Sequence, residues 1–136
     1  MVASAVMRIL LATLPANSAT ADLEALRLQA EELFRQGTLL APSAPDDAQH
    51  CFACSAQFYE RLRQAGADNP ALYRNLGNAY LLADDLPAAI LAYRRGLRLD
   101  PNDTQLQQGL AFARQQVVFP ASAAQTAPAE REDACS

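Results

Sequence analysis

Two cysteines spaced three residues apart are the side chains whose type and spacing point most directly to chemistry. Cys51 and Cys54 form the motif Cys-Phe-Ala-Cys, directly after His50, the single histidine of the chain. A C-x-x-C pair can be oxidised in an exported protein and is catalytic in redox folds built on βαβ units. The residues around this pair have helical periodicity instead. We therefore interpret both cysteines as small, fairly apolar helix residues, and a thiol-redox protein is the alternative.

Metal and acid–base catalysis have little support in the sequence. One histidine leaves few ways to build a Ser-His-Asp triad or a His-ligated metal site, and no second C-x-x-C completes a zinc site. His50 precedes the cysteine pair, whereas haem attachment requires a histidine after it. Asp84 and Asp85 are ordinary turn formers. We expect no catalytic residue, no metal and no cofactor, with Cys135 as a candidate intermolecular thiol.

The composition excludes some classes of partner. The chain has 136 residues, with 11 Lys+Arg against 15 Asp+Glu and a formal net charge of −4, and none of the basic residues is lysine. An acidic chain without lysine argues against a nucleic-acid binder, which needs a basic surface for phosphate contacts. Alanine supplies much of the 51% hydrophobic share. Because alanine buries little area per residue, we expect a thin core.

Residues 1–21 follow the order of a secretory signal peptide. Arg8 precedes a short apolar run at 9–14, and Ala19-Thr20-Ala21 supplies an A-x-A pattern before Asp22. The run is too short to span a bilayer, which needs about 20 residues. We therefore expect an exported, periplasmic or membrane-associated protein. A retained leader on a cytoplasmic protein is the alternative.

Apolar periodicity predicts an all-α fold with five helices. Gly37 is a candidate C-cap of the first helix, and Pro42 and Pro45 predict a loop over residues 38–47. The residues after Pro120 lack apolar periodicity, and we expect them to be disordered. The predicted helices cover residues 22–37, 48–66, 70–81, 87–99 and 104–118.

Between positions 70 and 103, seven residues form a pattern in which large side chains, small side chains and a proline stand at defined positions. They are Tyr73, Leu76, Gly77, Tyr80, Ala89, Tyr93 and Pro101. In this spacing they resemble a tetratricopeptide repeat, in which small residues let two antiparallel helices approach and large ones fill the space beside them. Gly96 departs from the pattern, because the family usually has alanine there. We expect that glycine to weaken its helix by up to about 1 kcal/mol.

The resemblance implies neighbouring helices, because one repeat cannot bury its own hydrophobic face. Residues 30–37 resemble part of a first helix, and Phe52, Ser55 and Tyr59 suit a second helix, with an insertion around the two prolines. The expected organisation is a right-handed α-solenoid of about two repeats and a cap. Its parts are a leader at 1–21, a degenerate repeat at 22–69, a well-matched repeat at 70–103, a capping helix at 104–118 and a tail at 119–136.

The resemblance also implies a concave binding face on the first helix of each repeat. Its positions here are Ala71, Arg74, Asn75, Asn78 and Leu81. Asparagine can donate to and accept from a peptide backbone, and arginine can bind a carboxylate with two parallel hydrogen bonds. A structural role for both asparagines, as caps or bridges between helices, is the alternative.

A complete carboxylate clamp is not expected. Arg74 and Asn78 match two positions of the clamp found in chaperone-tail binders. Gln108 and Gly109 stand where the next helix should supply asparagine and basic groups.

Three arginines form a basic cluster on the fourth helix. Arg94, Arg95 and Arg98 are interpreted as a solvated face offset by Asp100 and Asp103, with an acidic partner as the alternative.

The function expected from the resemblance is that of a non-catalytic interaction or assembly scaffold, which binds a peptide or partner subunit. A structural subunit of a membrane-associated complex is the alternative, and self-association would help to bury exposed helix faces. Residues 72–80 and 89–97 look like the tetratricopeptide proteins of bacterial aerotolerance (BatE-like) operons. Those proteins are exported or membrane-associated, and they act as scaffolds beside von Willebrand-type partners.

The leader yields a direct prediction. If residues 1–21 are removed on export, the mature protein from the native host begins at Asp22. Mass spectrometry of the intact protein measures this start, and a start at Met1 would contradict processing.

Overall fold

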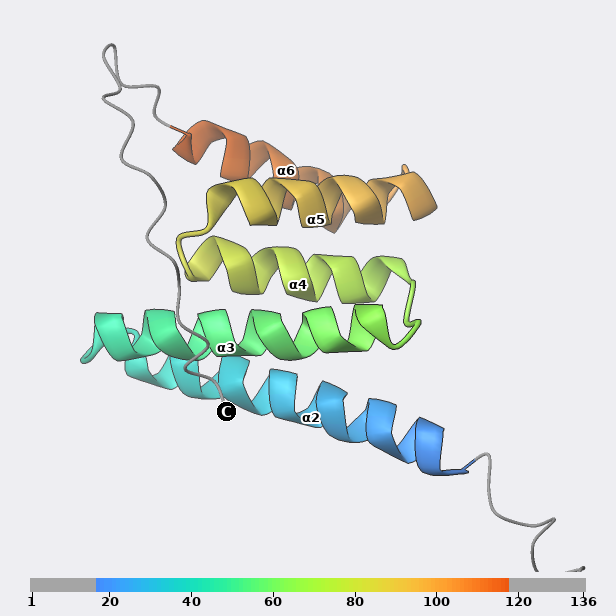
Figure 1. The fold of residues 1–136 in the computed structure, drawn as a ribbon. Helices are drawn as coiled ribbons and strands as arrows, with labels where there is room; N and C mark the ends of the chain where they lie inside the picture. Colours follow the sequence, from blue (N-terminus) through green and yellow to red (C-terminus); the bar gives the residue numbers. More distant parts are fainter. Residues whose placement is uncertain (1–16, 118–136) are drawn as a thin grey trace, which may run out of the picture.

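The computed structural model describes residues 17–117, and in this part of the chain it contains helices and turns but no strand. Figure 1 shows the helices stacked in chain order, each joined to the next by a short connection. The predicted all-α fold is confirmed. The helices are α2 (Asn17–Leu40), α3 (Pro45–Gln64), α4 (Pro70–Leu82), α5 (Leu86–Leu99) and α6 (Thr104–Gln116).

Two of the predicted segments fall largely or wholly outside the described residues. The leader is described only over residues 17–21, which belong to α2, and the tail, with Cys135, is not described. None of the helices described at 17–117 is long and apolar enough to cross a membrane.

Side-chain caps fix where the later helices begin. Asn69 Oδ1 accepts a hydrogen bond from the Leu72 backbone N at 2.9 Å, and Asp85 Oδ1 accepts one from the Ala88 N at 3.3 Å. Asp103 caps α6 in the same way. These bonds satisfy backbone donors that the first turn of a helix leaves unpaired, so the turn residues in the sequence mark the helix starts correctly.

The hairpin formed by α2 and α3 has longer helices and a shorter connection than predicted. The expected break in the helix is present but shorter than the predicted loop over residues 38–47, because α2 continues to Leu40 and α3 already begins at Pro45, where proline suits the first turn. Gly37 lies inside α2 and is not a C-cap. The expected insertion is mostly helix, since α2 has 24 residues and α3 has 20, against 13 in α4 and 14 in α5.

Small side chains hold α2 close to α3. A Cβ atom added at Gly37 would lie 2.8 Å from Cε1 of Phe52, so only glycine fits against that ring. Ser55 is fully buried, and its hydroxyl donates a 2.7 Å hydrogen bond to the carbonyl oxygen of Ala30. The small-residue position expected at Ser55 is therefore used for both close approach and a bond between the helices.

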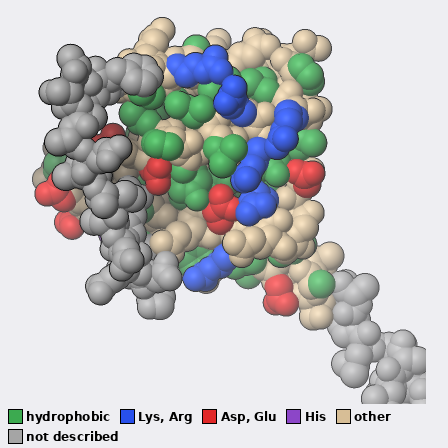
Figure 2. Space-filling model, turned by 45° about the horizontal axis from the view of Figure 1, so that its top comes forward, with side chains coloured by type: hydrophobic (Ala, Val, Ile, Leu, Met, Phe, Trp, Pro, Cys, Tyr) green, Lys and Arg blue, Asp and Glu red, His purple; other side chains and the backbone are tan. Residues whose placement is uncertain are grey.

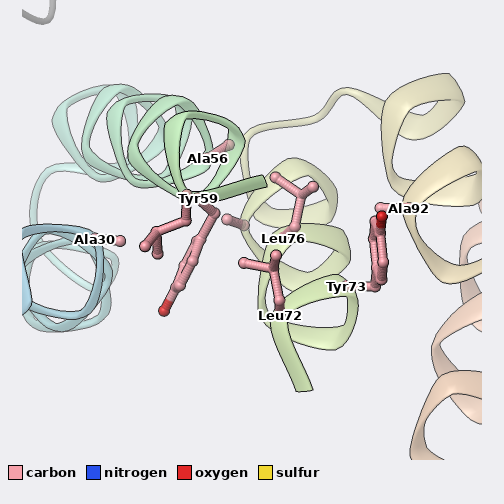
Figure 3. Packing of buried hydrophobic residues seen from close by; sticks show 9 residues of the cluster. Ala30, Ala56, Tyr59, Leu72, Tyr73, Leu76 and Ala92 are labelled. Atoms are coloured by element: carbon pink, nitrogen blue, oxygen red, sulfur yellow. The ribbon is translucent and has the colours of Figure 1, made fainter. Parts of the chain in front are cut away.

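The core continues from this hairpin through α4 to α5. Figure 3 shows Tyr59 of α3 beside Leu72 and Leu76 of α4, while Tyr73 extends from α4 toward Ala92 of α5. Leu76 is completely buried. The two sides of α4 thus pack against different helices, which makes α4 the central element of the stack.

Tyr93 of α5 occupies a space created by two glycines. Its side chain is fully buried, and Cβ atoms added at Gly77 or Gly109 would lie 2.5 Å and 2.6 Å from its Cε1. Gly96 has a comparable role, since a Cβ there would lie 2.8 Å from both δ-methyl carbons of Leu106. The departure from alanine at position 96 is therefore explained by the close approach of α6, and the expectation that it only weakens the helix is incomplete.

Substitution of Gly77 tests this packing. Gly77→Ala should overpack the site by about 1–3 kcal/mol, partly offset by a gain of about 1 kcal/mol in helix propensity. We expect a net loss in the free energy of unfolding, measured by urea denaturation, because the buried Tyr93 ring has no room to move.

A double-mutant cycle supplies the control for that substitution. In a Tyr93→Leu background the shorter side chain removes the clash, so Gly77→Ala should become neutral or stabilising. An equal effect of Gly77→Ala in both backgrounds would contradict the proposed contact.

Candidate functional site

A groove lies between α2 and α4, lined mainly by apolar surface with polar side chains along it. It consists of two adjoining hollows of about 470 and 490 Å³ that share Glu31, Tyr59 and Asn75 as lining residues. One hollow extends toward the C-terminal part of α2, at Thr38. The other extends toward Ala71, at the beginning of α4. The groove therefore follows the length of the α2–α4 face.

Three of the five predicted partner-binding residues line this groove. Asn75 lines both hollows, while Asn78 and Ala71 each line one of them. Arg74 is directed toward α6, with its Nη1 3.7 Å from Oδ2 of Asp103. Leu81 packs against the cluster of buried residues around Tyr93. The structure thus brings the asparagines and the alanine together, and it places the other two side chains elsewhere.

The two asparagines are connected to buried tyrosines. The hydroxyl of Tyr93 donates a 2.7 Å hydrogen bond to Oδ1 of Asn78. Burial raises the pKa of Tyr59 to about 12, and the nearby Asn75 side chain, which lines both hollows with Tyr59, slightly opposes that rise. Asn78 therefore bridges α4 and α5, as the structural alternative proposed, while its amide NH₂ group keeps two donors.

Ion pairs within α2 neutralise the charges along the groove. Arg27 pairs with Glu24 and Glu31, and Arg35 pairs with Glu32 at 2.6 Å. The Arg35 guanidinium lowers the pKa of Glu32 to about 2. Such exposed pairs contribute little stability, but they leave neutral side chains as the main hydrogen-bonding groups of the groove.

Sequence reasoning missed the α2 side of the groove. Glu31, Arg35, Thr38 and Leu39 line one hollow, yet the sequence prediction assigned the last two to a loop. The proline at position 45 was the available signal, because proline is favoured at the start of a helix and allows a short connection. Tyr59 was expected only as a packing residue.

The structure shows what surrounds the cysteine motif on α3 and the clamp position at Gly109 on α6. Cys51 is a half-buried free thiol, so it is not joined to Cys54, and Sγ of Cys54 lies 3.6 Å from Nε2 of His50. Residues 17–117 contain no cluster of three metal-binding side chains. Gly109, which stands where a clamp needs a polar group, is the residue that accommodates the Tyr93 ring.

Comparison with known proteins identifies one segment. Residues 70–103 match the family model described as a tetratricopeptide repeat, and this range covers α4, α5 and the turn up to the N-cap of α6. A search of curated proteins found no match to the chain.

The buried tyrosines predict a loss of stability at high pH. Burial raises the pKa of Tyr59 and Tyr93 to about 12, above the ordinary value near 10. Folding therefore favours the neutral phenol, and this stabilisation is complete below pH 10 and is lost as the pH rises toward 12.

Phenolate absorbance against pH measures this effect, in native buffer and in urea. We expect the native protein to titrate later than the unfolded chain, with unfolding above pH 10. Tyr93→Phe should remove one late-titrating group. Simple titration of all four tyrosines near 10 in the folded protein would contradict the prediction.

Proposed function

Because residues 70–103 form a tetratricopeptide repeat, a unit that mediates contacts between proteins, we propose that the chain is a non-catalytic interaction or assembly module. In this proposal the α2–α4 groove binds an extended peptide segment of a partner protein. Stacked repeats create extended concave surfaces of this kind.

The observation that carries the proposal is a row of neutral hydrogen-bonding side chains within the largely apolar lining of the groove. Asn75 and Asn78 lie one helical turn apart on α4, opposite Thr38 of α2. An extended peptide presents backbone N–H and C=O groups along its length, and an asparagine side chain can bind either. Because the arginines of α2 are already paired, recognition of the peptide backbone is favoured over recognition of a strongly charged ligand.

We place this module in an exported or membrane-associated assembly. The support is the order of residues in the leader at 1–21 and the likeness of the repeat to envelope proteins of the bacterial aerotolerance type.

Obstruction of the groove tests the proposed function. Ala71 is exposed and lines the groove, so Ala71→Arg should fill one hollow without removing a buried contact. Ala41→Arg in the α2–α3 connection is the matched control, since Ala41 is exposed and lines neither hollow. Both variants are used, beside the wild type, for crosslinking and pull-down from the native host.

We expect a specific partner to be recovered by the wild type and by Ala41→Arg but lost with Ala71→Arg. Once the partner segment is identified, its dissociation constant should rise about tenfold or more with Ala71→Arg, a change of about 1.4 kcal/mol. Equal recovery by both variants, with both still folded by circular dichroism, would exclude the groove as the binding site.

A further inference from the structure

The end of the stack formed by α5 and α6 carries a second hollow face, separate from the α2–α4 groove. It measures about 470 Å³. Figure 2, with this end turned forward, shows basic side chains beside hydrophobic ones. We call this face the arginine groove, and its residues are Leu91, Arg94, Arg95, Leu97, Arg98 and Leu110.

The arginines of this face lack acidic partners within the described part of the chain. The sequence suggested that Asp100 and Asp103 offset them, but both aspartates bind elsewhere. Asp103 caps α6 through Oδ1 and lies toward Arg74 through Oδ2, and Asp100 accepts a 3.1 Å hydrogen bond from the Asn102 N. No ion pair joins Arg94, Arg95 or Arg98 to a residue of 17–117, whereas Arg27, Arg35 and Arg63 are all paired.

The apolar part of the groove has the character of an unoccupied helix-packing surface. Within the described residues, α2 pairs with α3 and α4 with α5, while α6 packs only on α5 and α4. Leu91, which lines the hollow, is 48% exposed, and Leu97 beside it is half-buried. Exposed large apolar side chains beside a hollow are typical of a surface that another chain covers.

We propose that the arginine groove binds an acidic amphipathic helix of a partner protein. The leucine-type side chains of that helix enter the hollow between Leu91, Leu97 and Leu110, and its carboxylates pair with Arg94 and Arg98. Arginine binds carboxylates with two parallel hydrogen bonds, and an amphipathic helix matches a groove that is lined by both leucines and arginines.

Charge and symmetry favour an acidic helix over two other occupants, a second copy of this chain and a nucleic acid. A second copy in a two-fold contact would place the same arginines against one another, which is repulsive. A nucleic acid would leave the leucines without apolar partners, and the chain carries a net charge of −4. An acidic helix satisfies both the arginines and the leucines.

A pair of synthetic peptides tests the proposal with the full chain. The first is a labelled helix of about four turns, with leucines along one face and glutamates beside them. The second replaces every glutamate with lysine. We expect fluorescence anisotropy to show saturable binding of the glutamate peptide, weakening with salt, and no binding of the lysine peptide.

Three variants separate this groove from other sites. Arg98→Glu should weaken binding of the glutamate peptide about tenfold or more, while Arg35→Glu makes the same charge change on α2 and should have little effect. Ala71→Arg, which obstructs the α2–α4 groove, should leave this binding unchanged, so failure of either proposal can be recognised separately.

Three results would overturn the proposal. They are no binding of the glutamate peptide, equal weakening by Arg98→Glu and Arg35→Glu, or loss of binding with Ala71→Arg. Sedimentation adds a further criterion, since self-association that Arg98→Glu abolishes would assign the groove to a second copy instead.

Discussion

The enclosure of one tyrosine ring determines the spacing of the C-terminal helices. Tyr93 extends from α5 between glycines on α4 and α6, and no side-chain atom at either position could be added without a clash. A fully buried ring in such a space fixes the distance between three helices at once, because packed interiors resist even small changes in volume. The caps at the start of each helix then fix where each helix begins along the stack.

The hairpin of α2 and α3 also packs a glycine against a large ring, but its helices are longer. Gly37 receives the ring of Phe52, and the buried hydroxyl of Ser55 bonds across to α2. A thin, alanine-rich core is sufficient here because small residues bring helix backbones close together and the few large rings fill the remaining space. The longer helices of this hairpin also supply one side of the α2–α4 groove, so the irregular part of the stack helps to build the proposed binding face.

Much of the repeat could be predicted from the sequence, since its motif and its turn residues are local. Asn69 and Asp85 mark helix starts directly, and the resemblance to the repeat placed Asn75 and Asn78 on a common face. The α2 side of the groove could not be predicted, because two prolines near position 42 are compatible with either a long loop or a tight connection. The orientation of Arg74 toward Asp103 depends on how α6 lies against α4, and no pattern in the sequence encodes that distance.

The bond between Tyr93 and Asn78 also determines the polarity of what the groove can accept. Oδ1 of Asn78 receives the tyrosine hydroxyl, which holds this amide in one orientation and leaves both N–H donors of its NH₂ group for a ligand. A ligand that turned this amide over would separate a buried hydroxyl from its acceptor, at a cost of about 1–3 kcal/mol. Position 78 therefore presents its N–H donors at a fixed place on α4, where the carbonyl oxygen of a bound peptide would accept from them.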